Sequence, residues 1–421
     1  MYKKMQLAIS KLASKKLYVV VLLLFLVDLL TENYVISLFH KQTEIPPLAW
    51  FPLFMILQIL FAPLQTAASD HFTRKKVIYV ALYSNLICFV LGLFTLIFDC
   101  FTIWMFSLII IFKSILGNLI PLGLVSISDM HEKRYRPYFL GTTSIYALAF
   151  ILLRYGISGF SLTSFAILSL IFILTVLVLV YFHFFDVEDT QSDVTPYSRQ
   201  KPSEKRDSWV KCLVSCLRKV PATLILIFNQ ARKDKKNLID DICDKSIRSA
   251  LLGYFWWEVS MYSIIVSAVD LNFYKSSLFP LIMMCGFLFG VLFVLFVLKK
   301  WSDQRVIKWG YLISATSLAP IFIFGWSQAD RSLVITTCYF FHAAGNAFLS
   351  AAFMSLLAKE RSHHVQGRTY GLIESFDSLS FMVGTVTGIS IQALKLSTAS
   401  LVFFSFFSFM VSFKYYKRFQ E

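Results

Sequence analysis

The sequence predicts an all-α polytopic membrane protein with twelve transmembrane helices in two pseudo-symmetric bundles of six, and three observations support this. Of the 421 residues, 57% are apolar and only 15% are charged, which exceeds the apolar content that one soluble core can bury. The hydrophobic runs are long enough to cross a bilayer, since about 20 helical residues span the roughly 30 Å hydrocarbon layer. Lys and Arg gather in alternate loops, as they do on the cytoplasmic side of membrane proteins.

Twelve hydrophobic runs follow one another along the chain. They cover residues 17–38, 46–67, 77–98, 101–124, 139–159, 162–184, 249–270, 278–298, 308–326, 333–357, 369–391 and 397–413. Backbone polar groups find no water in lipid, so each run forms a helix or belongs to a closed barrel. Barrel strands alternate over about 10 residues, whereas these runs are longer and do not alternate. The first run is too long for a signal-peptide core and lacks a cleavage site after it, so we expect a retained helix.

The distribution of cations orients the chain with both termini in the cytoplasm. The opposite side keeps only Lys41, Lys275, Arg331 and Lys395. The net charge of +15 is then explained by cytoplasmic loops that face anionic lipid head groups, so membrane lipids are expected partners and nucleic acid is not. We expect the protein in a bacterial inner membrane, as a monomer.

A polar segment at residues 185–248 separates an N-terminal bundle, 1–184, from a C-terminal bundle, 249–421. Residues 186–208 read as a flexible linker. Residues 209–228 have apolar side chains at helical spacing, which indicates an amphipathic helix on the cytoplasmic leaflet or docked onto the protein.

The two halves also share short sequences at nearly the same spacing. Gly117-Asn118 recurs as Gly345-Asn346, 228 residues later, and "RKKVIYV" from Arg74 corresponds to "DQRVIKW" from Asp303. Internal duplication, with a site between the halves, is a recurring plan of transporters.

These features resemble the major facilitator superfamily, whose loop between helices 2 and 3 reads Gly-x-x-x-Asp-Arg/Lys-x-Gly-Arg-Arg/Lys. "TAASDHFTRK" matches this signature at Asp70, Arg74 and Lys75, and departs from it at Thr66, His71 and Thr73. Lys113 stands four residues before Gly117, where the family commonly has an Arg. Residues 365–388, "VQGRTYGLIESFDSLSFMVGTVTG", are similar to the family's usual approach to its eleventh helix.

The resemblance implies two bundles that rock about a mid-membrane site and expose it to each side in turn, with energy from a proton gradient. It also implies a cytoplasmic gate, in which Asp70 binds the start of the eleventh helix near Gly367 and Arg368. Arg74 and Lys75 complete this gate. Helix 139–159 lacks the Gly-Pro motif of drug/proton antiporters and holds Arg154 instead, which argues against a typical multidrug exporter.

Ionisable residues within the hydrophobic runs form the candidate site. Placing a charged side chain at mid-membrane costs upwards of about 2.5 kcal/mol of free energy, so such residues usually face a cavity or a partner. They are Asp28, Glu32, Lys113, Arg154, Glu258, His342, Glu374 and Asp377. Two interpretations stay open for the acids: interhelical ion pairs with Lys113 or Arg154, or proton-binding carboxylates. His342 alone is more typical of a hydrogen-bonded packing residue. Trp256 and Trp257, beside Glu258, either line the cavity or pack.

The predicted function is secondary active transport of a small polar or charged solute, as proton-coupled uptake. An exporter or an uncoupled facilitator remains an alternative, as does a receptor or scaffold that has kept the fold. No enzymatic activity or cofactor is expected, and the sequence has no phosphate-binding Gly-x-x-x-x-Gly-Lys-Ser/Thr motif for an ATP-driven pump. No metal site is expected either, because His363-His364 lies in a basic loop without acidic or Cys neighbours.

Overall fold

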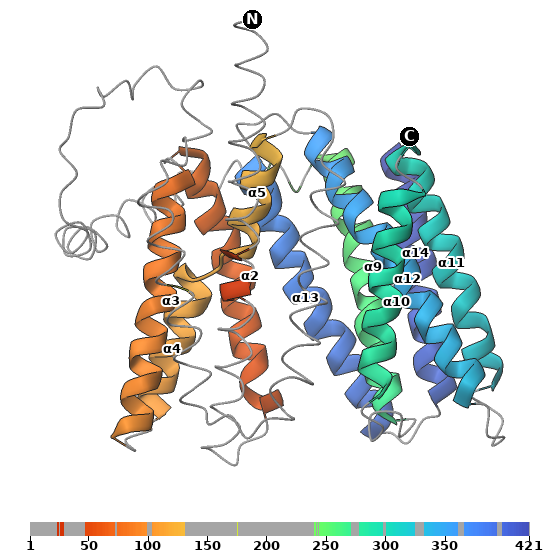
Figure 1. The fold of residues 1–421 in the computed structure, drawn as a ribbon, viewed down its shortest axis with the longest axis horizontal. Helices are drawn as coiled ribbons and strands as arrows, with labels where there is room; N and C mark the ends of the chain where they lie inside the picture. Colours follow the sequence, from red (N-terminus) through yellow and green to blue (C-terminus); the bar gives the residue numbers. More distant parts are fainter. Residues whose placement is uncertain are drawn as a thin grey trace, which may run out of the picture. The chain divides into compact units, whose positions relative to one another are not determined.

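The computed structural model describes ten helices and short stretches beside them (Figure 1). The described residues are 47–71, 74–98, 103–130, 244–270, 278–297, 300–324, 332–360, 366–393 and 398–420, with 23, 24, 26–28, 175, 240 and 242. Within these ranges the regular structure is α-helical throughout.

The described residues fall into two compact units. Unit 1 contains α2 (Pro47–His71), α3 (Arg74–Ile97), α4 (Ile103–Leu116) and α5 (Ile120–Met130). Unit 2 contains α9 (Lys245–Asp270), α10 (Leu278–Phe296), α11 (Asp303–Phe324), α12 (Ser332–Glu360) and α14 (Thr398–Gln420). Helix α13 (Gln366–Ala393) belongs to unit 1 through Leu372 and to unit 2 from Ile373. The domain limits predicted from the sequence stay a prediction.

Nine of the twelve predicted runs coincide with described helices, although the predicted run 101–124 is wrong as one continuous helix. The chain leaves the helical path at residues 117–119, between α4 and α5 (Figure 1). The runs 17–38, 139–159 and 162–184 lie outside the described residues apart from isolated positions, and the predicted surface helix 209–228 lies wholly outside them.

Proline explains the break in the fourth run. Pro121 has no N–H to donate to the carbonyl of Gly117, and inside a continuous helix its ring would clash with that carbonyl. At the second position of α5 the same residue is favourable, because the first amides of a helix have no partner within it. Pro121 therefore favours a new helix start at α5, after the three residues that follow α4.

In unit 1, α4 packs against both α2 and α3. A buried apolar cluster joins α3 to the start of α5 and to the described residues near position 24; its members are Leu24, Val27, Val77, Ile78, Ala81, Leu82, Tyr83, Leu119 and Leu122. Large apolar side chains on the outer faces are exposed, and Trp104 reaches 77%. An exposed apolar surface suits a chain whose solvent is lipid.

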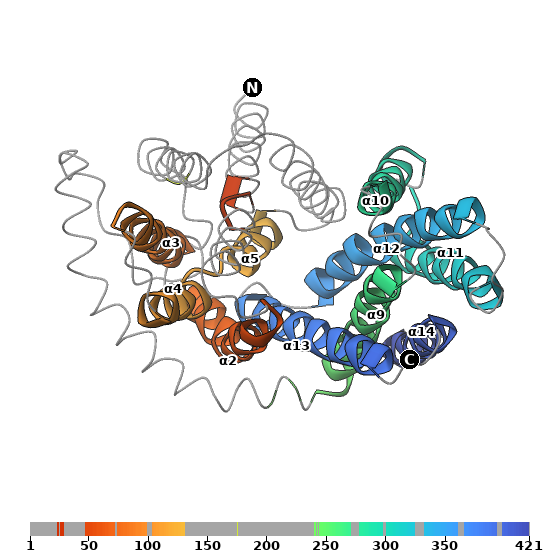
Figure 2. The ribbon, with the colours of Figure 1, turned by 90° about the horizontal axis from the view of Figure 1, so that it is seen from below.

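In unit 2, α12 packs against α10 and α11, and α14 packs against α9 (Figure 2). Glycines allow the close approach of α10 to α12: a Cβ added at Gly290 would lie 2.8 Å from the Cα of Ala344. Small residues at helix contacts are typical of membrane proteins, where dispersion replaces the hydrophobic effect.

Two described stretches, Trp104–Ser126 and Thr336–Leu357, are long and apolar enough to cross a membrane by length and composition alone. The first combines α4 and α5 across the break. Two shorter apolar stretches, Val77–Gly92 and Leu281–Phe296, accompany them among the described residues.

Candidate functional site

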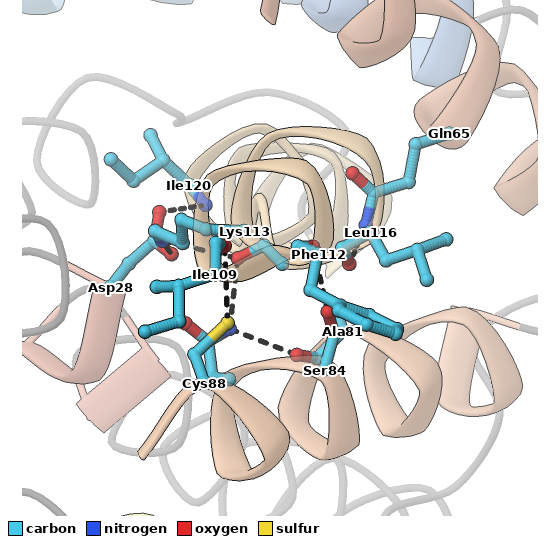
Figure 3. A network of polar contacts seen from close by, with 12 residues as sticks. Asp28, Gln65, Ala81, Ser84, Cys88, Ile109, Phe112, Lys113, Leu116 and Ile120 are labelled. Carbon is cyan, nitrogen blue, oxygen red and sulfur yellow. Dashed lines mark hydrogen bonds and ion pairs between the residues drawn. The ribbon is translucent and has the colours of Figure 1, made fainter. Parts of the chain in front are cut away.

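The carboxylate of Asp28 and the ammonium group of Lys113 form a buried ion pair in unit 1 (Figure 3). Each side chain is only 2% exposed. Of the pairings that the sequence leaves open, the structure shows this one. Glu32 and Arg154 lie outside the described residues.

The pair lies at the break between α4 and α5. The amide of Ile120, the first residue of α5, donates to Asp28 Oδ2 at 3.3 Å. Lys113 lies in the last turn of α4 and its Nζ is 3.3 Å from the carbonyl of Gly117. The carboxylate therefore binds a cation and the positive end of a helix dipole at once.

Side chains from neighbouring helices bind the carbonyls that the break releases. Gln65 of α2 donates to the carbonyl of Leu116 at 2.6 Å, and Asn85 of α3 donates to that of Gly117 at 2.9 Å. Ser84 Oγ donates at 2.7 Å to the carbonyl of Phe112, which also keeps a backbone bond from the Gly117 amide at 3.1 Å. The break is thus a stable feature, because its buried carbonyls are satisfied.

Four polar side chains around the break, Gln65, Asn85, Ser114 and Asn118, have a hydrogen-bonding atom without a partner in the described part of unit 1. Gln65 Oε1 and Asn85 Oδ1 have no donor among these residues, although the amide nitrogens of both residues are bonded. Both the amide nitrogen and the carbonyl oxygen of Asn118 lack a partner there, and so does the hydroxyl of Ser114. Asn118 is 1% exposed and Ser114 is fully buried. A buried polar group without a partner costs about 1–3 kcal/mol and calls for an explanation.

In unit 2, carboxylates of α9 and α13 share an aromatic environment. Glu258 is buried and lies one helical turn after Tyr254 on α9, while Tyr262 Oη donates to Asp377 Oδ1 at 3.4 Å. Asp377 and Glu374 are half-buried on α13. The structure therefore gathers three of the predicted acids in one unit.

The two tryptophans beside Glu258 differ. Trp257 is buried and its Nε1 donates to Asn346 Oδ1 of α12 at 2.8 Å, so it packs between helices. Trp256 is half-buried and meets Phe255 edge to face. His342 is fully buried in α12, with Nδ1 3.4 Å from the carbonyl of Ser314.

The predicted cytoplasmic gate residues meet in unit 1, which includes the first turns of α13. The amides of Gly367 and Arg368 donate to Asp70 Oδ1 and Oδ2 at 2.9 and 3.0 Å. Arg74 pairs with Asp70 Oδ1 at 2.9 Å. Burial raises the pKa of the Asp70 carboxyl, and Arg74 and the two amides oppose this shift. For Lys75 only the helical backbone is described.

Thr66, which stands where the family signature has a glycine, packs against glycines of α13, and sequence reasoning missed this contact. A Cβ added at Gly371 would lie 2.6 Å from the Cα of Pro63 and would collide with Thr66 Oγ1, and a Cβ at Gly367 would collide with the carbonyl of Thr66. The Thr66 hydroxyl turns back to the carbonyl of Ala62 at 2.7 Å. Glycines on α13 therefore make the space that a glycine at position 66 would otherwise make.

Solved structures of similar fold cover nearly the whole chain. The human organic anion transporter MFSD10 (TETRAN) covers 96% of this chain and 99% of its own, with a TM-score of 0.70 at 15% identity. The proton:xylose symporter XylE covers 97% of this chain and 96% of its own (0.67, 12% identity). The Escherichia coli fucose:proton symporter FucP covers 95% of this chain and 97% of its own (0.67, 12% identity). At such identities the likeness concerns the fold alone.

A comparison with curated proteins finds no match. The family model described as "Major Facilitator Superfamily" matches residues 17–385, which is most of the sequence. This match confirms the resemblance and, with the similar structures, the predicted fold of twelve helices in two bundles within a membrane. The chain belongs to the major facilitator superfamily, whose members are transporters rather than enzymes.

Proposed function

We propose that this protein takes up a small polar or charged solute together with protons, and that Asp28 is the residue that binds the proton. The observation that carries this proposal is the buried pair of Asp28 and Lys113 at the break between α4 and α5. In this proposal the protein works as a monomer in a bacterial inner membrane, with both termini in the cytoplasm.

Asp28 interacts differently with its surroundings in its ionised and its neutral form. As a carboxylate, Asp28 binds Lys113 and the Ile120 amide. As a neutral acid it loses most of its attraction to both, because the interaction of two charges in a low-dielectric interior depends on each being ionised. Protonation therefore frees the Lys113 cation and the Ile120 amide in one step, and a change of this kind can bias the equilibrium between the two states of a carrier.

Glu258 and Asp377 support a second proton-binding position in unit 2. They are acids of α9 and α13, which meet through the rings of Tyr262 and Phe381, and Asp377 accepts a hydrogen bond from Tyr262. Both acids stay candidates for coupling, together with Glu374.

Asp70 is the proposed cytoplasmic latch. Its carboxylate caps the start of α13 through the amides of Gly367 and Arg368, and α13 continues into unit 2. Breaking this contact would release the helix that the two units share. We propose that the contact forms in one access state and is lost in the other.

Proton flux tests the proposal even while the solute is unidentified. Proteoliposomes loaded with a pH-sensitive dye are exposed to amino acids, nucleosides, sugars and organic anions, and solutes that alter the internal pH are then followed as labelled compounds. A symporter accumulates such a solute only when a pH gradient is imposed. An uncoupled facilitator gives flux that is indifferent to the gradient, an exporter moves the solute outward against it, and a receptor or scaffold gives no flux.

Asp28→Asn is expected to abolish gradient-driven accumulation and to retain counterflow exchange, because the amide has nearly the shape of the carboxylate but cannot carry the proton. Asp240→Asn is the matched control, since Asp240 is exposed just before α9. Full accumulation by the Asp28→Asn protein would refute the assignment of the proton to Asp28.

A further inference from the structure

The Gly-Asn sequence of the fourth helix has an internal counterpart that lacks both the break and the charges. Gly345 and Asn346 lie inside the continuous helix α12, and Leu349 stands where Pro121 stands in unit 1. Trp257, 229 residues after Asp28, binds this Asn through a neutral hydrogen bond of 2.8 Å. The Gly-Asn sequence of unit 2 is therefore packed without a helix break or an ion pair. Packing alone does not explain why unit 1 has both a break and a buried ion pair at the equivalent position.

The groups at the break form a site for a carboxylate. Lys113 Nζ, the amide of Ile120 and the positive end of α5 all face Asp28, and they already hold a carboxylate, that of the chain itself. Helix α5 has 11 residues, so its dipole is developed. The described titratable groups around this carboxylate are Lys113 of α4 and Cys88 of α3, whose Sγ bonds the carbonyl of Ile109 at 3.5 Å.

Asn118 provides an independent sign of a ligand. It lies in the three-residue break itself, is 1% exposed, and neither of its two polar side-chain atoms has a partner in the described part of unit 1. In the counterpart, Asn346 Oδ1 accepts from Trp257 and only Nδ2 lacks a partner among the described residues, whereas Asn118 lacks a partner at both atoms. The energetic cost of leaving Asn118 unpaired is recovered when a polar molecule occupies the break.

We propose that the transported solute carries a carboxylate, which takes the place of the Asp28 carboxylate at Lys113 and the Ile120 amide, with Asn118 binding an adjacent polar group of the solute. This inference rests on the proposed function. A proton from the outer solution neutralises Asp28, and the carboxylate of the solute then balances the charge of Lys113. One proton therefore accompanies each monocarboxylate, and this step carries no net charge.

Ligand-induced thermal stabilisation of the full-length protein in detergent tests the site directly. The probes are acetate, lactate, succinate, citrate and glutamate, each compared with its neutral amide. In Asp28→Asn the internal competitor is gone, so at least one of these carboxylates should bind about tenfold more tightly than to the wild type in mildly alkaline buffer. The amides should not bind, and adding Lys113→Met to Asp28→Asn should abolish binding.

A second measurement needs no variant. Wild-type affinity for the same carboxylate should rise as the buffer is made mildly acidic, because protonation of Asp28 removes the competitor, whereas the affinity of Asp28→Asn should stay constant. Equal binding of carboxylate and amide, or no binding of any of these carboxylates to Asp28→Asn, would overturn the inference. Proton-driven uptake of a solute without a carboxylate would also overturn the inference, but it would leave the proposed function intact. Uptake that does not respond to a pH gradient for any solute would instead overturn the proposed function itself.

Discussion

At the scale of single residues, two asparagines of the same region differ in their hydrogen bonds. Asn85 Nδ2 donates to the carbonyls of Ala81 and Gly117, each at 2.9 Å, and only its Oδ1 lacks a partner among the described residues. Asn118 is equally buried, and among the described residues its side chain has no partner. The first asparagine stabilises the break, whereas the second is available for a ligand.

Alanine substitutions separate these roles. Asn118→Ala should leave the melting temperature of the ligand-free protein unchanged or raise it, because an unpaired buried amide is removed, and it should weaken carboxylate binding about tenfold or more. Asn85→Ala is the matched control, and it should lower the melting temperature because the carbonyl of Gly117 loses a donor. Equal destabilisation by both substitutions would show that Asn118 has a structural role.

At the scale of elements, Pro121 and hydrogen-bond donors from neighbouring helices together divide the fourth transmembrane segment into two helices. Pro121 prevents the carbonyl of Gly117 from bonding within the helix, and α2 and α3 supply other donors. In unit 2, α11 continues through Pro320. A proline alone therefore does not force a break of this size, and the donors of neighbouring elements decide how the chain responds.

Pro121→Leu introduces the residue of the counterpart position, Leu349. The new amide can donate to the carbonyl of Gly117, so we expect a more continuous segment and unchanged or higher thermal stability. Transport should fall by at least about tenfold, because the Ile120 amide that binds Asp28 is drawn back into the helix. Pro320→Leu is the control and should leave transport unchanged. Wild-type transport by Pro121→Leu, measured in proteoliposomes, would show that the break is dispensable.

At the scale of the whole molecule, α13 has a special place because its first turns belong to unit 1 and the remainder to unit 2. The contacts in unit 1 depend on glycine, since an added Cβ at Gly367 would lie 2.5 Å from Asp70 Oδ1. Any movement that separates α2 from the start of α13 must also break the cap on Asp70.

Asp70→Asn and Gly367→Ala should therefore each reduce transport about tenfold or more, while expression and solute binding stay close to those of the wild type. Asp70→Asn removes the charge that attracts Arg74 and the start of α13. Gly367→Ala adds a methyl group that pushes the start of α13 away from the Asp70 carboxylate. Asp240→Asn again controls for the loss of one surface charge. Uptake in proteoliposomes, compared with binding in detergent, measures the two effects, and an equal loss of binding would contradict a role limited to the latch.

The sequence by itself determined the membrane class, the helices and the family, because lipid imposes a length and an apolar composition on every helix that crosses it. It also identified Asp28 and Lys113 as candidate partners, since charges within hydrophobic runs are rare. Only the tertiary structure decided that Lys113 pairs with Asp28, that Trp257 packs against Asn346, and that α4 stops where α5 begins. These features depend on groups that are distant in sequence: a released carbonyl or a buried charge binds whichever donor the packing brings within reach, and no periodicity within one helix records that choice.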